Sequence, residues 1–364
     1  MFKHLLISLF CFLTCTANAQ SDTFRIAVAG HTYGAHAGTN IGLYPEFLST
    51  FNDHKNRYDY LVLTGDIVRN STTNSWNTVA GELDAMGLPY YYVRGNHEKG
   101  SIATNVFTNK HGGNYYAFKE GNLLNVVLNS GQYSAQVSNE EITFLSNTLA
   151  AYQDSVDYIF VYFHFLLWNG DPKYIDIKSN LGSQHNYLKN TANYWADIHP
   201  VLNNYPNKAI HVIAGDLGGR SYSIPAYYEN LGHIKLTASG MGEVPDENYL
   251  AYTFVNQQLV STKVIPLDTT LPTRDISYYE YFATNLAELN ENDDLLRVHG
   301  NTLMWLGNRD IELAVYQLNG QHVHTLRLEP QKELVLPVQE TGIYLLCGIA
   351  NNRLITKKVY SGAH

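Results

Sequence analysis

Short apolar runs recur along the first two thirds of the chain, and each run stops at a glycine or a polar residue. They cover residues 25–30, 61–64, 90–93, 158–163 and 209–215. Runs of this length, rich in β-branched and aromatic residues, are typical of strands buried in a parallel sheet. Between them, residues 44–51, 72–86 and 139–149 carry apolar residues at helical spacing. This alternation predicts an α/β or α+β fold with crossover helices.

Local signals refine this pattern. Residues 115–118 and 123–128 predict a hairpin, because a Glu-Gly-Asn turn sequence joins them. Asn139 is expected to cap the helix that follows it. Two more strands are expected, at residues 236–242 and 252–255.

The last 70 residues or so show a different pattern, in which apolar and polar residues alternate in short runs between turns. Such spacing predicts a small β-sandwich. We therefore expect a first domain at residues 22–267, a polar linker at 268–294 and a C-terminal β-sandwich domain at 295–364.

The N-terminus predicts export. Residues 1–19 combine Lys3, an apolar run at 5–13 and a small-x-small ending at Ala19, as secretory signal peptides do. The run is too short for a membrane anchor. Cys15 would suit a lipoprotein signal instead, but the residue before it fits that signal poorly. We expect cleavage before Gln20 and a secreted or cell-surface protein, with the periplasm as a further location.

Composition narrows the partners. The chain of 364 residues has a formal net charge of −9, which argues against nucleic acid as a partner. Cleavage of the leader would leave Cys347 as the single cysteine, so no intrachain disulfide is expected. The 28 tyrosines suit either strands or the binding of polar ligands such as sugars.

Polar side chains follow two neighbouring predicted strands. Asp66 comes after Gly65, and Asn96 and His97 come after Gly95. In open α/β sheets, ligands bind at the carboxyl ends of the strands. A carboxylate, an amide oxygen and an imidazole there suit a divalent metal and a phosphate. Each Gly-polar pair is also common as a turn or helix cap.

These motifs resemble the calcineurin-like metallophosphoesterases. That family combines Asp-x-His, Gly-Asp, Gly-Asn-His-Asp/Glu, a lone His after a strand, and Gly-His-x-His. Here Gly-Asp at 65–66 and Gly-Asn-His-Glu at 95–98 match letter for letter, and His164 follows a strand without the usual proline. The resemblance covers residues 24–267 and implies a layered sheet sandwich flanked by helices.

Two motifs depart from the family pattern. His31 and Tyr33 stand where the family has Asp-x-His, and Asp216 and Gly218 replace the two His of Gly-His-x-His. The resemblance then implies one divalent ion, with Mn, Fe, Zn, Mg and Ca all open, and a second, weaker position that keeps at best Asp66, His31 and Tyr33. The ligands implied for the more secure site are Asp66, Asn96, His164 and Asp216.

The resemblance also implies roles around the metal. His97 would donate a proton to the leaving oxygen or hold a phosphate oxygen, and Glu98 would orient His97. Tyr33 and Arg94 are candidates for substrate binding, although Arg94 is equally suited to a buried salt bridge. The polar, aromatic insertion at residues 168–195 is expected to shape substrate access or to be an ordered surface loop.

The C-terminal stretch resembles the sorting domain of proteins exported by the type IX secretion system. The resemblance uses Val-Tyr-Gln-Leu-Asn-Gly at 315–320, Gly-Ile-Tyr at 342–344 and Lys-Lys-Val at 357–359. It implies the secretion machinery as a partner. A carbohydrate-binding or structural β-module is the alternative.

Three functions stay open at this point. The first is a secreted hydrolase that cleaves a phosphate monoester or diester, from a small phosphate ester or a phosphorylated glycan, with metal-activated water. The second is a phosphoesterase-fold protein that binds a glycan or phosphorylated ligand without hydrolysis. The third is an enzyme of another reaction class that uses the altered site.

Overall fold

The computed structural model describes residues 22–131, 135–175, 177–244, 246–281 and, towards the C-terminus, 296–299, 302–305, 310–317, 320–330, 332–338, 342–350 and 353–361. The predicted signal peptide, its cleavage site and residues 282–294 of the predicted linker lie outside these ranges. No helix within the described ranges is long and apolar enough to span a membrane.

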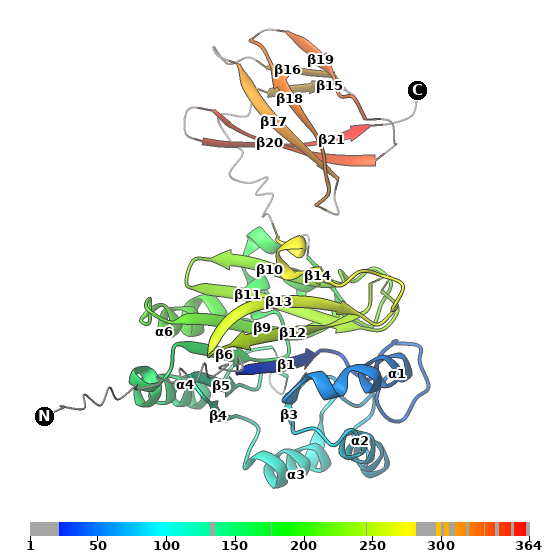
Figure 1. Ribbon diagram of the computed structural model, residues 1–364, viewed down its shortest axis with the longest axis vertical. Coiled ribbons are helices and arrows are strands. Elements are labelled where there is room, and N and C mark those ends of the chain that lie inside the picture. The colour runs from blue at the N-terminus through cyan, green and yellow to red at the C-terminus, as the bar shows by residue number, and fades with distance from the viewer. Residues whose placement is uncertain are drawn as a thin grey trace, which may run out of the picture.

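Two six-stranded sheets pack face to face in the N-terminal part of the chain (Figure 1). The first has the order β14-β13-β12-β1-β2-β3, with bounds Arg274–Asp275, Gln258–Pro266, Asn248–Val255, Thr23–Ala29, Tyr60–Thr64 and Tyr90–Val93. The second has the order β10-β11-β9-β6-β5-β4, with bounds Ala226–Leu231, Ile234–Met241, Ala209–Gly218, Tyr158–Tyr162, Leu123–Val127 and Tyr116–Glu120.

Three apolar cores hold these layers together. Buried side chains from both sheets, such as Val62, Phe160 and Tyr252, form the core between the sheets. The outer face of the first sheet packs against α1 (Pro45–His54), α2 (Thr73–Met86) and α3 (Gly100–His111). The outer face of the second packs against α4 (Asn139–Tyr152), α5 (Gln184–Leu188) and α6 (His199–Asn203). The predicted layered α/β fold with flanking helices is confirmed.

The predicted helices and the hairpin are present, with one correction at a helix start. Ser138, not Asn139, caps α4, because its side chain accepts a hydrogen bond from the backbone amide of Glu141. The Glu141 side chain bonds back to Ser138, which completes a capping box. The chain offered two adjacent cap residues, and only Ser138 has an acidic residue three positions on.

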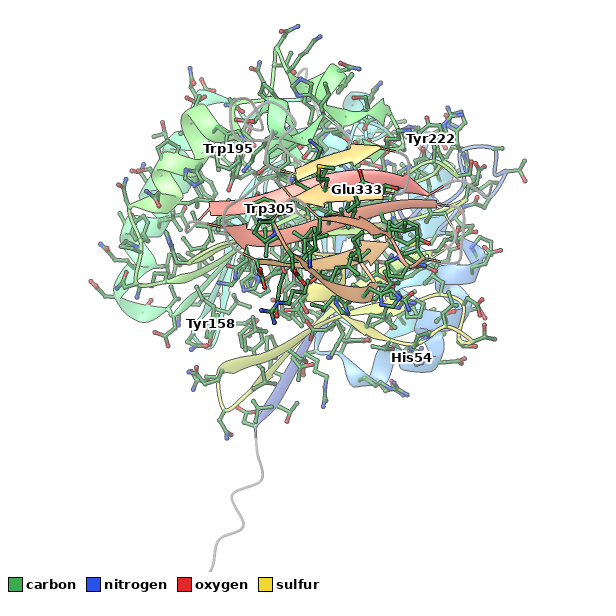
Figure 2. The ribbon with its side chains drawn as sticks, turned by 90° about the horizontal axis from the view of Figure 1, so that it is seen from above. His54, Tyr158, Trp195, Tyr222, Trp305 and Glu333 are labelled. Atoms are coloured by element: carbon green, nitrogen blue, oxygen red, sulfur yellow. The ribbon has the colours of Figure 1, made fainter. Side chains whose placement is uncertain are left out.

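The C-terminal part forms two small sheets (Figure 1). One contains β15 (Leu296–His299), β16 (Thr302–Trp305) and β19 (Glu333–Val335). The other contains β17 (Ile311–Gln317), β18 (His322–Leu328), β20 (Gly342–Ala350) and β21 (Arg353–Ser361). Trp305 and Glu333 lie on strands of the smaller sheet (Figure 2). Leu303, Leu313 and Leu346 share one buried core, so the two sheets face each other.

The predicted linker is shorter than expected at its N-terminal end. Residues 274–281 form β14 and a 3-10 turn that pack on the N-terminal sheets. Ile276 is buried there, and the Tyr281 hydroxyl donates to the backbone oxygen of Lys173 at 2.9 Å. These contacts assign residues 274–281 to the N-terminal part.

Candidate metal centre

The candidate site lies where strands of both sheets end. His31 follows β1 and Asp66 follows β2, and both adopt the left-handed backbone conformation, with φ of 53° and 52°. This conformation costs non-glycine residues about 1–3 kcal/mol and clusters at functional sites. Between β2 and Asp66, a Cβ atom on Gly65 would lie 2.5 Å from Nδ1 of His164. The two sheets therefore approach each other closely at this point, and a side chain at residue 65 would keep them apart.

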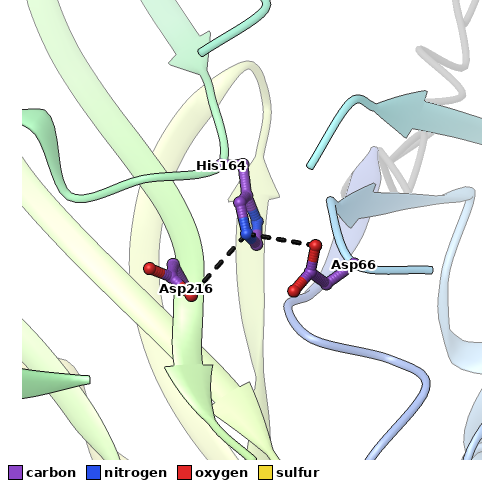
Figure 3. Close-up of side chains that lie close together, drawn as sticks. All are labelled: Asp66, His164 and Asp216. Atoms are coloured by element: carbon purple, nitrogen blue, oxygen red, sulfur yellow. Dashed lines mark ion pairs between the residues drawn. The ribbon is translucent and has the colours of Figure 1, made fainter. Parts of the chain in front are cut away.

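Three buried side chains meet here: Asp66 from the first sheet, and His164 and Asp216 from the second (Figure 3). The Nε2 atom of His164 lies 3.3 Å from Oδ1 of Asp66 and 3.6 Å from Oδ1 of Asp216. It also lies 3.0 Å from Oδ1 of Asn96. The other ring nitrogen, Nδ1, donates to the backbone oxygen of Thr64 at 3.0 Å. That bond directs Nε2 to the cluster, so the four ligands predicted for one metal do come together.

The buried polar atoms of this cluster fit a divalent cation. Oδ2 of Asp66 and Oδ1 of Asp216 are buried and have no hydrogen-bond partner within the described residues. Unpaired buried carboxylate oxygens are costly unless a cation compensates them. One ligand atom from each of Asp66, His164 and Asp216 lies within 4.8 Å of the others. Two carboxylates, an imidazole and the amide oxygen of Asn96 are a donor set that protein-bound divalent metals accept.

The charges of the cluster point to the same conclusion. Burial lowers the pKa of His164, but the carboxylates of Asp66 and Asp216 raise it to about 10. Burial raises the pKa of Asp66, and three nearby imidazoles together bring it below its usual value. Burial raises the pKa of Asp216 well above its usual value. A bound cation would favour the ionised form of Asp216 and would take the place of the proton on His164.

The second oxygen of Asp66 faces a different group of side chains. Its Oδ2 atom lies 3.7 Å from Nε2 of His31 and 3.9 Å from Nε2 of His97. The Nδ1 atom of His31 is 3.1 Å from the backbone oxygen of Met241, and its Nε2 is buried without a hydrogen-bond partner within the described residues. Burial lowers the pKa of His31 to about 4. The ring is therefore neutral near pH 7 and can offer Nε2 as a ligand.

Tyr33 fills the space between His31 and His97. Its ring centroid lies 4.2 Å from that of His31 and 4.7 Å from that of His97. The Arg69 guanidinium lies 4.7 Å from the ring, and the Tyr33 hydroxyl lies 3.4 Å from Nε2 of His97. Burial, followed by the charge of Asp66, raises the pKa of Tyr33 well above its usual value. Without a metal, Tyr33 is therefore a phenol that can donate a hydrogen bond.

Glu98 does not orient His97, contrary to the expectation from the sequence. Its buried carboxylate accepts hydrogen bonds of 2.8–3.1 Å from the backbone amides of residues 66–68 and of Gly95. His97 instead donates from Nδ1 to the backbone oxygen of Arg69 at 2.7 Å. Neighbouring side chains in this turn point in different directions, so Glu98 faces inward and supports the left-handed turn at Asp66.

Arg94 is also turned away from the cluster. Its side chain is buried, and it donates to the backbone oxygen of Glu98 at 2.8 Å and to Oδ1 of Asn114 at 2.7 Å. It also bonds to Thr104 on α3 at 3.2 Å. These contacts fasten the loop after β3 to α3, which corrects the predicted role in substrate binding. The alternative expectation, a buried salt bridge at Arg94, stays a prediction.

Gly218, at the position of the second family His, has no room for a side chain. Its φ is 80°, and a Cβ atom would lie 2.3 Å from the backbone oxygen of Met241. A ligand cannot be restored there by substitution unless the backbone moves. The backbone at this position therefore leaves no room for a ligand side chain.

Two side chains at the site were not predicted from the sequence. Gln184, from the insertion, donates from Nε2 to Oδ2 of Asp216 at 2.8 Å. Arg69 donates to the backbone oxygens of Ala35 and His36 at 2.6 and 2.7 Å, which holds the loop after β1. Neither residue belongs to a recognisable motif. The position of Gln184 in the aromatic insertion was the only available signal.

Comparisons with known proteins agree with the site motifs. Residues 21–217 match the model of the calcineurin-like phosphoesterase family. A search of curated proteins finds no match. Among solved structures, a purple acid phosphatase from yellow lupin (Lupinus luteus) seeds is similar, with 13% identity, a TM-score of 0.48, and coverage of 72% of this chain and 53% of that one. This chain thus spans about half the length of that phosphatase.

Two further structures show weaker similarity. One is a conserved uncharacterised protein from Streptococcus pneumoniae described as a predicted phosphoesterase, with 10% identity, a TM-score of 0.30, and coverage of 68% of this chain and 91% of that one. The other is a double mutant of Vps29 from Entamoeba histolytica, with 8% identity, a TM-score of 0.29, and coverage of 93% of this chain and 100% of that one.

Proposed function

The chain belongs to the calcineurin-like phosphoesterase family, and we propose that it is a metal-dependent hydrolase of a phosphate monoester or diester. The observation that carries the proposal is the meeting of Asp66, His164 and Asp216, whose unpaired buried oxygens favour a cation. Asn96 completes the ligand set. When bound there, a divalent ion lowers the pKa of a coordinated water and offsets charge on the phosphoryl oxygens.

His97 supplies the proton in this proposal. Its side chain is 30% exposed, whereas those of Asp66 and His164 are fully buried, so substrate approaches from the side of His97. The bond from Nδ1 to the Arg69 oxygen leaves Nε2 as the nitrogen that gains and loses a proton. The imidazolium form can pass that proton to the leaving oxygen. The Tyr33 hydroxyl, next to Nε2, can donate a hydrogen bond to a phosphoryl oxygen or to the neutral imidazole.

The substrates that we propose are small phosphate esters or phosphorylated glycans. We also propose that residues 1–19 direct export and that the C-terminal β-domain serves as a sorting domain, which places the mature protein at the cell surface or outside the cell. These proposals follow from the sequence motifs, and the buried core of the C-terminal part supports a separate folding unit.

Binding without hydrolysis is the second candidate function. It is favoured by Tyr33, whose ring occupies the space between His31 and His97, and by Gly218, which excludes a ligand. A second metal would then be absent, together with its contribution to the reaction. In that case the site would bind a phosphorylated ligand and release it unchanged.

Metal content and hydrolysis should be measured together. We expect about one divalent ion per chain by elemental analysis, and hydrolysis of p-nitrophenyl phosphate or bis(p-nitrophenyl) phosphate that a chelator abolishes. Asp216→Ala should lose both properties, while the matched control Asp154→Ala, at an exposed site in a 3-10 turn, should keep both. Metal binding without hydrolysis above the Asp216→Ala level would support the binding protein instead. Absence of metal from the wild type would refute both readings of the site.

A further inference from the structure

The insertion reaches the candidate metal centre through one fully buried side chain. Gln184 is the first residue of α5, and its Nε2 atom lies 2.8 Å from Oδ2 of Asp216. A carboxylate accepts hydrogen bonds and an amide NH₂ group donates them, so the orientation of the Gln184 amide is fixed by its partner. The contact joins residues that are 32 positions apart in the chain.

This hydrogen bond sets the rotation of the Asp216 carboxylate. With Oδ2 held by Gln184, the other oxygen, Oδ1, faces Nε2 of His164 at 3.6 Å. That oxygen has no hydrogen-bond partner within the described residues. The Asn180 side chain, in the same segment, also bonds to Asp216. Without the Gln184 amide, the carboxylate would keep only that partner from the segment and could turn about its Cβ–Cγ bond. Partners of this kind beyond the ligands orient them and contribute to metal affinity.

The same side chain lies in a segment with little secondary structure of its own. Residues 177–188 contain two-residue strands, β7 (Lys178–Ser179) and β8 (Gly182–Ser183), and the short helix α5. The segment is attached to the rest of the protein at the buried Leu188 and at His185, whose Nδ1 lies 3.0 Å from the backbone oxygen of Asn169. The backbone oxygen of Lys178 also accepts a bond of 3.1 Å from the Ile224 amide, and that of Asn180 accepts one of 3.1 Å from the Tyr222 hydroxyl. The Gln184 side chain ties it to the candidate metal centre.

We propose that Gln184 is a positioning residue that holds the Asp216 carboxylate and thereby links metal binding to the order of residues 177–188. The proposal rests on the proposed function, since it needs a metal at the cluster. Its consequence is that a metal at the cluster protects residues 177–188 further against local opening. The alternative is that Gln184 only packs against its neighbours. In that case neither its NH₂ group nor a link between metal binding and residues 177–188 would be needed.

Gln184→Met tests this, because methionine keeps the length of the side chain and removes the donor. Competition with a fluorescent chelator would give the apparent Kd for Mn²⁺. Amide hydrogen exchange over residues 178–188 would be measured with and without Mn²⁺. We expect Gln184→Met to weaken Mn²⁺ binding about 10–100-fold. Mn²⁺ should slow exchange in the segment in the wild type but not in the variant. Gln153→Met, at an exposed amide that donates to the backbone oxygen of Ala150, is the matched control and should behave as wild type.

The outcomes separate this inference from the proposed function. Mn²⁺ affinity within about twofold of wild type, or equal protection of the segment in both proteins, would overturn the role of Gln184 while leaving the phosphoesterase proposal intact. If the wild type binds no Mn²⁺, both the proposed function and the link between metal binding and residues 177–188 fail. Crystal structures of wild type and Gln184→Met would then test whether Gln184 positions the Asp216 carboxylate. A rotated Asp216 carboxylate in the variant would support positioning, and an unchanged one would refute it. Gln184→Glu, which has the same shape but donates no hydrogen bond when ionised, replaces Gln184→Met if the latter does not fold.

Discussion

Replacing Glu98 should destabilise the protein, although the sequence motif assigns this residue to catalysis. The carboxylate is 1% exposed and accepts four backbone hydrogen bonds, two at each oxygen. A buried donor left without a partner costs about 1–3 kcal/mol. Glu98→Ala leaves four such donors, so we expect a loss of unfolding free energy of roughly 4 kcal/mol or more. Glu98→Gln keeps one oxygen that accepts two of these bonds, but its NH₂ group faces the other two backbone amides, which then have no acceptor. The expected loss of unfolding free energy is therefore roughly 2–4 kcal/mol.

Urea unfolding followed by tryptophan fluorescence measures this loss, because Trp76 packs near the first sheet against Tyr92. Glu140→Gln is the matched control, since Glu140 is exposed in the first turn of α4, and its unfolding free energy should stay within about 0.5 kcal/mol of wild type. A similarly small effect for Glu98→Gln, combined with lost hydrolysis, would refute the structural role. It would restore the interpretation in which Glu98 orients His97.

Three further predictions follow from other contacts. Gly218→Ala should cost more stability than Gly232→Ala, because both residues have φ near 80° but only at Gly218 would a Cβ meet a neighbour, at 2.3 Å from the Met241 oxygen; equal melting temperatures would contradict this. Burial lowers the pKa of His211 to about 3 from 6.5, so the unfolded chain takes up a proton first as the pH falls. The free energy of unfolding is therefore highest above pH 6.5, is about 2 kcal/mol lower at pH 5 and continues to fall until pH 3. Urea unfolding of His211→Leu at the same pH values should lack this part of the pH dependence. A chain that ends after Tyr281 should keep its metal and melting temperature, whereas one that ends after Thr273 should melt lower because it loses Ile276 from the core; secretion of either truncated chain at the normal level would refute the sorting role.

The sequence was most informative where the signal is local. Apolar runs that end in Gly-Asp or Gly-Asn-His identify buried strands and the loops that follow them, so Asp66 and Asn96 could be placed together from the sequence, and the family resemblance added His164. The directions of Glu98 and Arg94 were not predictable in this way. Both depend on the rotation of the chain within one turn, and a motif records residue types but not that rotation.

Contacts between distant parts of the chain were the second gap. Gln184 reaches Asp216 only because the insertion folds back over the ends of β6 and β9, and no periodic pattern marks that path. Likewise, β14 joins the first sheet through two residue pairs with β13, which is too short a run to produce a strand signal. Tertiary packing decides such elements, and local preference does not.

The geometry also explains how ligand residues could change while the site remained. The left-handed turn at Asp66 is held by Glu98, and the Nδ1 atom of His31 lies against the Met241 oxygen, so backbone contacts fix these positions independently of the ligand atoms. A carboxylate at residue 216 can then take the place of an imidazole, because its oxygen starts from the same strand end and a neighbouring amide can orient it. At residue 218 the backbone leaves no room for a side chain, and no ligand stands there. A change of ligand residue is thus tolerated where other contacts fix the main chain. Glu98 therefore supports the metal centre by holding the main chain at Asp66, although Glu98 is not itself a ligand.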